Sequence, residues 1–511
     1  MQTLHTPQDA ARWLGQRGVG RLHTDSRQVQ RGDAFLAWPG ARHDGRRHVM
    51  HVLAQGAAAC LMEAQDVQID TGMQTEALAA YPRLKQASGL IADAYYEHPS
   101  HQLDVVAVTG TNGKTSSTWW LAQALTRLGR RCAVVGTLGM GEVQRSADGT
   151  PEVRGPRTGL TTPDAVVFQG ALHDFVLAGI KACAVEASSI GLTEHRLQGT
   201  RVRVALFTNF TQDHLDYHGS MQAYWEAKRR LFEGADLHAA VVNLDDPKGP
   251  ALVAHWQLRD EMTADRLWTF GESAQARLQA RNIRFVADDG AALSTGLCFD
   301  VVEGLEVHAL ATPFVGRFNV SNLLGVLASL RALGISLADA VTACQDLLAV
   351  PGRMQTVSCT GQPLVVVDYA HTPDALRQAL QALQPLAQAR GGRLHCVVGC
   401  GGDRDVGKRP MMAAAAQTHA DQVVLTSDNP RSEDPLHILQ QMQAGLTSPL
   451  AVLSVVDRAQ AIAHAIAQAA SADIVLIAGK GHEDYQEIHG VRHPFSDVQH
   501  ARAALQMRGA A

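Results

Sequence analysis

The residues best suited to chemistry form a glycine-bracketed loop that follows the apolar run 105–108 and opens into a helix-like segment. The loop consists of Gly110, Thr111, Asn112, Gly113, Lys114 and Thr115. Its backbone N–H groups, helped by the positive end of the following helix, can cradle phosphate oxygens. The lysine neutralises phosphate charge, and the last threonine hydroxyl reaches a magnesium ion. An ordinary strand-to-helix turn would not need these side chains in this order, so the loop predicts binding of a nucleoside triphosphate.

Polar side chains follow other predicted strands of the same region. Glu186 ends the run 182–186, and Asn209 and Asn243 end two later runs. In an open α/β sheet the ligand crevice lies beyond the carboxyl ends of the strands, so these side chains should point toward the site around Lys114. A role in capping a helix or turn is the better interpretation for Asn243 and the poorer one for Glu186.

A second polar cluster occupies residues 213–219 (Asp-His-Leu-Asp-Tyr-His-Gly) and brings an imidazole to the same predicted sheet edge. Magnesium prefers hard oxygen ligands with occasional help from nitrogen. Glu186 and His214 are therefore the candidate metal ligands. Asp216 and His218 are better interpreted as structural residues.

Bulk properties set limits on the class of protein. A chain of 511 residues exceeds what one hydrophobic core usually serves, so we expect two to four domains. Hydrophobic residues at 46% and charged ones at 19% fit folded domains without a membrane span. The net charge of −5 argues weakly against a nucleic-acid partner. Scattered cysteines without metal-site spacing, and an N-terminus without a secretion signal, predict a cytoplasmic protein.

The elements that must position these residues alternate between strands and helices, which predicts an α/β protein of three domains. Residues 1–100 form a small N-terminal α/β domain. Residues 101–350 form a central phosphate-loop domain with a mostly parallel sheet. Residues 351–511 form a C-terminal Rossmann-like α/β domain, whose predicted strands are 363–368, 394–399, 422–426 and 473–479.

Six segments together are specific to one family. They are 109–115, 186–189 (Glu-Ala-Ser-Ser), 213–219, 318–322 (Phe-Asn-Val-Ser-Asn), 351–354 (Pro-Gly-Arg-Met) and 368–374 (Asp-Tyr-Ala-His-Thr-Pro-Asp). Through them nearly the whole chain resembles the Mur ligases, ATP-dependent amide-forming enzymes of peptidoglycan precursor and cell-wall synthesis. On sequence chemistry alone, Lys228 would be a solvated or snorkelling lysine. The resemblance implies instead that it is carbamylated (N6-carboxylysine), so that it becomes a carboxylate-like magnesium ligand.

The resemblance also implies the ATP and metal contacts. ATP would be bound by the loop 110–115 together with Asn319, Arg353 and Asp368. Mg²⁺ would be held by Thr115, Glu186, His214 and carbamylated Lys228. Lys114, Lys228 and His214 would be the catalytic residues. Since the implied ATP contacts come from two predicted domains, we expect the third domain to close on the second during turnover.

A UDP-linked muramoyl dipeptide is the implied first substrate. Its contacts would come from Ser26, Ala41, Arg42, His43, Thr161, Thr162, Ser188, Glu194 and Arg196. Glu194 departs from the family pattern, which has glutamine at this position. A carboxylate facing an anionic substrate would repel it unless the carboxylate is turned away or neutralised.

Residues 428–431 (Asp-Asn-Pro-Arg) resemble the segment by which one branch of the family recognises meso-2,6-diaminopimelate. They are accompanied by 399–405 and 479–483, which also follow predicted strands. The implied contacts are Arg404, Asp428, Asn429, Pro430, Arg431, Gly479 and Glu483. Forked arginine donors suit the two carboxylates of diaminopimelate, and Glu483 and Asp428 suit its amine ends. Lysine, which lacks the second carboxylate, would leave charge unpaired.

The implied reaction begins when ATP phosphorylates the D-glutamyl γ-carboxylate of UDP-N-acetylmuramoyl-L-alanyl-D-glutamate. The diaminopimelate amine then displaces phosphate to form an amide. We expect a monomer that uses no nucleic acid. The rivals are a lysine-adding Mur ligase, another superfamily ligase such as a folylpolyglutamate synthase, and a nucleotide-gated switch that hydrolyses ATP without transferring anything.

Overall fold

The computed structural model describes residues 1–40, 43–65, 75–146, 151–157, 159–258, 263–286, 296–357, 359 and 361–510. They form two compact units. The first comprises Met1–Gln279, Glu303–Glu306 and Asn322–Cys344; the second comprises Ala280–Val302, Val307–Ser321 and the chain from Gln345 onward. Within the described ranges, no helix is long and apolar enough to cross a membrane.

The first unit begins with a five-stranded parallel sheet in the order β1-β5-β4-β3-β2. The strands are β1 (Gln2–Thr3), β2 (Leu22–His23), β3 (Ala34–Ala37), β4 (Ala59–Glu63) and β5 (Leu78–Tyr81). Helices α1 (Pro7–Gly15) and α3 (Leu84–Tyr95) pack on one face, and α2 (Val49–Ala54) packs on the other. Because both faces are covered, every residue of β3 is apolar and buried.

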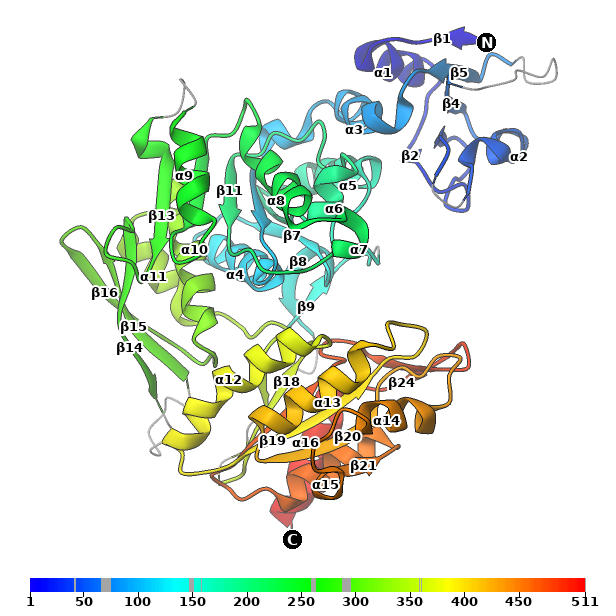
Figure 1. Cartoon of the computed structure of the whole chain (residues 1–511). Helices are drawn as coiled ribbons and strands as arrows, with labels where there is room; N and C mark the ends of the chain where they lie inside the picture. Colours follow the sequence, from blue (N-terminus) through cyan, green and yellow to red (C-terminus); the bar gives the residue numbers. More distant parts are fainter. Residues whose placement is uncertain are drawn as a thin grey trace. The chain divides into compact units, whose positions relative to one another are not determined.

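The same unit continues into a larger sheet, in which strands follow the order β13-β12-β11-β6-β10-β7-β8-β9. Figure 1 labels β13, β11, β7, β8 and β9 of this sheet. The strands are β6 (Asp104–Thr109), β7 (Cys132–Gly136), β8 (Gly139–Arg145), β9 (Pro151–Arg154), β10 (Ala182–Glu186), β11 (Val204–Phe207), β12 (Ala239–Asn243) and β13 (Leu267–Gly271). The pairings among β13, β12, β11, β6, β10 and β7 are parallel, whereas β8 and β9 are antiparallel additions. The sequence pattern predicted the parallel core but not this antiparallel edge.

Helices cover both faces of this sheet. The helices of this region are α4 (Lys114–Arg127), α5 (Ala165–Leu177), α6 (Ser189–Thr193), α7 (Leu215–His218), α8 (Met221–Arg229), α9 (Gly249–Gln257), α10 (Phe318–Ala332) and α11 (Leu337–Gln345), of which α7 packs on α8. Val105 and Ala107 of β6 belong to the core formed with α5, α8 and α9. On α10, Gly325 lies against Leu206 and Phe270 of the sheet. The phosphate loop and Glu186 therefore lie at the ends of strands whose two faces are both packed against helices.

The second unit contains a six-stranded sheet in the order β17-β18-β22-β19-β20-β21, in which only β17 runs antiparallel to its neighbour. Its strands are β17 (Gln355–Val357), β18 (Leu364–Asp368), β19 (Leu394–Cys400), β20 (Gln422–Ser427), β21 (Leu453–Val455) and β22 (Ile474–Ala478). The remaining strands are β14 (Leu278–Val286), β15 (Gly296–Glu303) and β16 (Glu306–Thr312), which are neighbours in that order, and the hairpin of β23 (Tyr485–Ile488) and β24 (Val491–Pro494).

Alternate residues of β18 enter different cores. Leu364 and Val366 pack with α12 (Pro373–Ala389), α13 (Lys408–His419) and α14 (Pro435–Gln443), while Val365 and Val367 pack with α15 (Arg458–Gln468) and α16 (Asp497–Ala510). A strand that is covered on both faces has a continuous run of apolar residues in its sequence, as residues 364–367 show. The α/β class predicted from the sequence is confirmed.

Candidate active site

The phosphate loop joins the end of β6 to the start of α4, and two of its glycines have positive φ angles. Gly110 has φ 151° and Gly113 has φ 84°. A Cβ atom on Gly113 would lie 2.3 Å from Oδ1 of Asn322. Glycine is therefore required at this position both for its conformation and for space.

The loop is held from inside and from the neighbouring strand. The Lys114 Nζ donates to the carbonyl oxygens of Gly110 and Thr111, at 2.9 and 2.8 Å. The side chain of Asn209, after β11, accepts from the backbone N–H of Asn112 at 2.8 Å and donates to its carbonyl at 3.1 Å. The structure thus brings Asn209 to the loop, as the strand-end argument predicted. Asn243 instead donates to the Thr208 carbonyl at 2.7 Å.

Glu186 ends β10 and reaches the start of α4. The Thr115 hydroxyl donates to its Oε2 at 3.0 Å, and the backbone N–H of Thr137 donates to its Oε1 at 2.8 Å. Only 1% of Glu186 is exposed. A Cβ atom on Gly136 would lie 2.1 Å from Oε1, so this glycine makes room for the carboxylate. The pair of Thr115 and Glu186 offers hard oxygen donors of the kind magnesium prefers.

Lys228 lies on α8 and is 1% exposed. Its Nζ donates to the Gly110 carbonyl at 2.7 Å and lies 4.5 Å from the centre of the Tyr224 ring. Burial, followed by the positive charge of Lys114, holds the pKa of Lys228 well below its usual value of 10.5. A buried lysine with a lowered pKa is a better nucleophile, which suits carbamylation.

His214 is the most exposed member of the predicted metal set. Its Nε2 lies 3.4 Å from Oδ2 of Asp213, with 42% of each side chain exposed, and its φ angle is 50°. Among the described residues, no group of three or more His, Cys, Asp or Glu side chains is arranged to hold a metal ion. The magnesium set of Thr115, Glu186, His214 and Lys228 stays a prediction, and it needs the extra carboxylate that carbamylation would give Lys228.

Three of the predicted substrate residues are joined to the end of β10. The Thr162 hydroxyl donates to the Glu186 carbonyl at 2.6 Å and lies 2.9 Å from the Ser188 hydroxyl. Arg196 donates to the Thr162 carbonyl at 2.9 Å. Thr161 lies next to them, with its hydroxyl 3.4 Å from that of Thr137. These candidate substrate contacts are therefore next to the candidate metal ligand Glu186.

Glu194, at the end of α6, has two hydrogen-bond partners, of which Lys85 carries the opposite charge. Lys85 of α3 donates to Oε2 and the Tyr217 hydroxyl donates to Oε1, both at 2.5 Å. These bonds lower the pKa of Glu194, while burial and the carboxylate raise the pKa of Tyr217 to about 12. The repulsion expected from the sequence is thus offset by Lys85, which the sequence did not reveal because it lies 109 residues away.

The predicted uridine contacts lie near the N-terminal sheet. Ser26 lines a cavity of about 650 Å³ with Arg27, Val29, His48, His51 and Gln55. His43 is exposed, and its carbonyl accepts from the backbone N–H of Gly40 at 2.8 Å. The other two predicted contacts, Ala41 and Arg42, lie outside the described residues.

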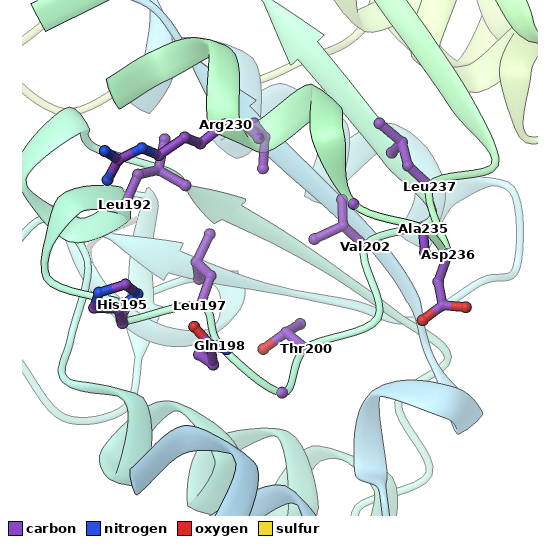
Figure 2. A pocket seen from close by; sticks show the side chains of 13 residues that line it. Leu192, His195, Leu197, Gln198, Thr200, Val202, Arg230, Ala235, Asp236 and Leu237 are labelled. Atoms are coloured by element: carbon purple, nitrogen blue, oxygen red, sulfur yellow. The ribbon is translucent and has the colours of Figure 1, made fainter. Parts of the chain in front are cut away.

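A different cavity, of about 350 Å³, adjoins the end of α6, from which Leu192 lines it. Its labelled side chains come from the segment around Leu192 to Val202, from Arg230, and from the loop that precedes β12 (Figure 2). None of the residues predicted from the sequence to contact ATP, metal or substrate lines it.

Three predicted ATP residues belong to the second unit. Asn319 donates to the Val315 carbonyl at 2.7 Å. Asp368, at the end of β18, accepts from the backbone N–H of Met354 at 2.7 Å, and burial raises its pKa. The Arg353 guanidinium lies 4.7 Å from the centre of the Tyr369 ring.

The predicted acceptor residues gather after β19, β20 and β22 of the second unit. Asn429 donates to Oε2 of Glu483 at 2.8 Å. Arg431 has φ 51° and donates to the Gly402 carbonyl at 2.7 Å. Arg404 is exposed.

Two glycines of these loops allow close packing. Gly479 has φ 117°, and a Cβ atom there would lie 2.6 Å from Oδ2 of Asp428. The loop of Pro430 packs closely on Gly402, whose added Cβ would lie 2.0 Å from the Pro430 carbonyl.

Comparison with known proteins identifies the family. Three family models match: the Mur ligase family catalytic domain over residues 19–96, the Mur ligase middle domain over 108–330, and the Mur ligase glutamate ligase domain over 352–481. A curated protein of Acidovorax sp. (strain JS42), named UDP-N-acetylmuramoyl-L-alanyl-D-glutamate–2,6-diaminopimelate ligase, is 55% identical over 100% of this chain and 99% of its own length. The chain belongs to the Mur ligase family.

Two further relatives of this Mur ligase carry the same name. One, from Janthinobacterium sp. (strain Marseille), is 46% identical over 95% of this chain and 94% of its own length. A solved structure with that name is 35% identical, has a TM-score of 0.67, and covers 96% of this chain and 95% of its own chain.

Two buried arginines of this Mur ligase belong to none of the motifs seen in the sequence. Arg409 pairs with Glu433 at 2.8 Å and donates to the Gly401 carbonyl at 3.2 Å. This pairing lowers the pKa of Glu433 to about 2. Arg458 pairs with Asp497 at 2.7 Å, both fully buried. Neither arginine lies in a recognisable motif, so only the fold reveals that they support the acceptor loops.

Proposed function

We propose that this Mur ligase uses ATP to join meso-2,6-diaminopimelate to the D-glutamate γ-carboxylate of UDP-N-acetylmuramoyl-L-alanyl-D-glutamate. Relatives that are 55% and 46% identical over almost the whole chain carry the name of that activity. The observation that carries the choice of acceptor is the hydrogen bond between Asn429 of the Asp-Asn-Pro-Arg segment and Glu483. A paired amide and carboxylate at a strand end suits a ligand with both an ammonium and a carboxylate.

The first chemical step transfers the γ-phosphoryl group of ATP to an oxygen of the γ-carboxylate, which leaves ADP and an acyl phosphate. Lys114 and the N–H groups of the loop would neutralise and orient the phosphates. Thr115, Glu186, His214 and carbamylated Lys228 would hold magnesium. When bound, the ion would offset negative charge on the phosphates.

The second step forms the amide. The neutral amine of diaminopimelate attacks the acyl carbon, the bond to phosphate breaks, and inorganic phosphate leaves while the amine nitrogen loses a proton. Arg404 and Arg431 would bind the acceptor's carboxylates with forked donors. Asp428 and Glu483 would bind its ammonium. Thr161, Thr162, Ser188 and Arg196 would hold the muramoyl dipeptide, and Ser26 and His43 the uridine end.

We also propose that the reaction takes place in the cytoplasm and that the enzyme acts as a monomer. All eight cysteines are free thiols, and seven of them are buried. Absence of disulfides is typical of proteins from a reducing compartment.

The test is phosphate release measured with the UDP-linked dipeptide and with either meso-diaminopimelate or lysine as the acceptor. We expect ATP turnover to require both co-substrates, with meso-diaminopimelate strongly preferred. Arg431→Ala should remove that preference while leaving the KM for ATP unchanged. Equal use of lysine would support the lysine-adding rival, and ATP hydrolysis without either co-substrate would support the nucleotide-gated switch.

A further inference from the structure

Lys480 is a fully buried lysine in the loop that follows β22. It is 0% exposed, and its Nζ donates to Oδ1 of Asn429 at 3.0 Å and to Oε2 of Glu483 at 2.9 Å. An ammonium placed away from water is stable only when it is paired and hydrogen-bonded. Lys480 meets that need with two residues that the proposed function assigns to the acceptor amino acid.

These contacts fix the orientation of the Asn429 amide. Its Oδ1 accepts from Lys480 and also from the backbone N–H of Glu487, at 3.0 Å. Both partners can only donate, so the amide oxygen must be on their side. The Nδ2 group donates one hydrogen to Glu483 and, within the described part of the chain, makes no other hydrogen bond. Toward a ligand, Asn429 can therefore act only as a donor.

The same contacts give the two carboxylate oxygens of Glu483 different roles. Oε2 accepts from both Lys480 and Asn429, and no described residue donates to Oε1. Glu483 is 20% exposed at its side chain, so Oε1 can meet a ligand. An ionised carboxylate only accepts hydrogen bonds, which directs this oxygen to an ammonium.

The backbone beneath these side chains has a separate support. Arg458 donates to the carbonyls of Ser427 and Ala478, at 3.2 and 3.0 Å. These residues end β20 and β22, from which the loops of Asn429 and Lys480 begin. Loss of the Lys480 ammonium should therefore loosen the Glu483 carboxylate, and leave the Asn429 oxygen held by the backbone N–H of Glu487 alone, without releasing the strand ends.

We propose that Lys480 is a positioning residue that makes Asn429 a donor to a carboxylate, and Glu483 an acceptor for an ammonium, of the incoming amino acid. This inference rests on the proposed function, because it assumes that a zwitterionic amino acid binds here. It assigns Lys480 no contact with the ligand. Its effect passes through the orientation of two neighbours.

The test compares Lys480→Met, which keeps the length of the side chain, with Arg390→Met as the matched control. Arg390 donates to the carbonyls of Ala472 and Ser471, near the opposite end of β22. We expect Lys480→Met to raise the KM for meso-diaminopimelate about 10-fold or more, the effect of losing a hydrogen bond to a charged group. The KM values for ATP and for the UDP-linked dipeptide should stay within about twofold, and Arg390→Met should change none of them.

The double variant Lys480→Met/Glu483→Gln separates positioning from stability. It leaves no unpaired buried charge, so it should recover the Tm lost in Lys480→Met. If Lys480 acts through Glu483, the double variant should have the same acceptor KM as Glu483→Gln alone. Three results would overturn the inference. The effects of the two single variants on the acceptor KM could multiply in the double variant, the acceptor KM could stay unchanged in Lys480→Met, or all three KM values could rise equally. A wild-type enzyme that does not use meso-diaminopimelate would overturn the proposed function and this inference together.

Discussion

The Nζ atom of Lys228 lies 2.7 Å from the carbonyl oxygen of Gly110, the first glycine of the phosphate loop. Burial, followed by the positive charge of Lys114, lowers the pKa of this amine well below 10.5, so a larger share of it is neutral than in an exposed lysine. A neutral amine can attack carbon dioxide, form a nitrogen–carbon bond and lose one proton, which leaves a carbamate with one negative charge. The geometry therefore explains how a lysine in this position can become an anionic ligand.

Lys228→Met should lower kcat at least about 100-fold, the usual scale for losing one group that stabilises charge in the transition state. Depletion of carbon dioxide should lower wild-type activity, bicarbonate should restore it, and native mass spectrometry should find the mass of one carbon dioxide on the wild type only. Lys181→Met, at an exposed site, is the control. Full activity of Lys228→Met would contradict the assigned role.

The same variant should also unfold at a higher temperature. In the unfolded chain Lys228 binds its proton up to pH 10.5, whereas in the folded chain it releases that proton at lower pH. The unmodified lysine therefore destabilises the fold at neutral pH, and this cost diminishes as the pH rises toward 10.5. Thermal unfolding of Lys228→Met at pH 7 in buffer free of carbon dioxide should give a higher Tm than the wild type, with a smaller difference at pH 10.

The pairing of Lys85 with Glu194 predicts that substituting the lysine affects substrate binding more than substituting the glutamate. Lys85→Met would leave the Glu194 charge unpaired beside an anionic substrate, so the KM for the UDP-linked dipeptide should rise several-fold. Glu194→Gln should change that KM less than about twofold, and adding it to Lys85→Met should restore the KM. Equal effects of the two single variants would show that the pair binds substrate directly. Its stabilising effect, below about 1 kcal/mol for exposed partners, should be present above pH 4.5 and be lost as acid protonates Glu194.

Gly113 and Gly129 form a matched pair for testing the phosphate loop. Their φ angles are 84° and 79°, but a Cβ atom at Gly129 would have no neighbour within 4 Å. Both alanine variants should lose about 1 kcal/mol or more of stability through backbone strain. Only Gly113→Ala should also weaken ATP binding, measured by calorimetry, because its Cβ atom would displace Asn322. Equal ATP affinity in the two variants would contradict the role of the loop.

Thr115 and Glu186 predict how activity depends on magnesium. Thr115→Val keeps the shape of the side chain but removes the hydroxyl that donates to Glu186. The Mg²⁺ concentration for half-maximal activity should rise about 10-fold, whereas Thr115→Ser should resemble the wild type. Thr126→Val, on the same helix, is the control, and chelation of magnesium should abolish turnover in every variant. An unchanged magnesium dependence in Thr115→Val would remove Thr115 from the metal set.

Local patterns were sufficient to predict the layers of the fold. Residues 182–185 and 474–477 are apolar throughout because helices cover both faces of their sheets, and that pattern is visible in the sequence. The antiparallel strands β8 and β9 were not predicted, because β8 contains two glycines and ends in exposed polar residues and β9 has only four residues, so neither has a clear apolar periodicity. Boundaries of the three predicted domains remain predictions, since the described residues divide into two units.

The site residues also differ in how well the sequence alone predicts them. The phosphate loop and Glu186 each belong to a short contiguous motif that can be recognised in the sequence. The structure places Thr115 against Glu186. Lys85, Arg458 and Asp497 carry no local signal, because each acts through a partner distant in the chain. Their roles depend on packing, which one sequence does not encode in any short pattern.

The bond from Thr162 to the Glu186 carbonyl has a consequence for inhibitor design. Ser188 lies two residues after Glu186, and the same threonine hydroxyl holds both. A substitution that shifts Ser188 to evade an inhibitor would also shift the Glu186 carboxylate. Compounds that bind along this short stretch should therefore select few resistant variants that keep full activity.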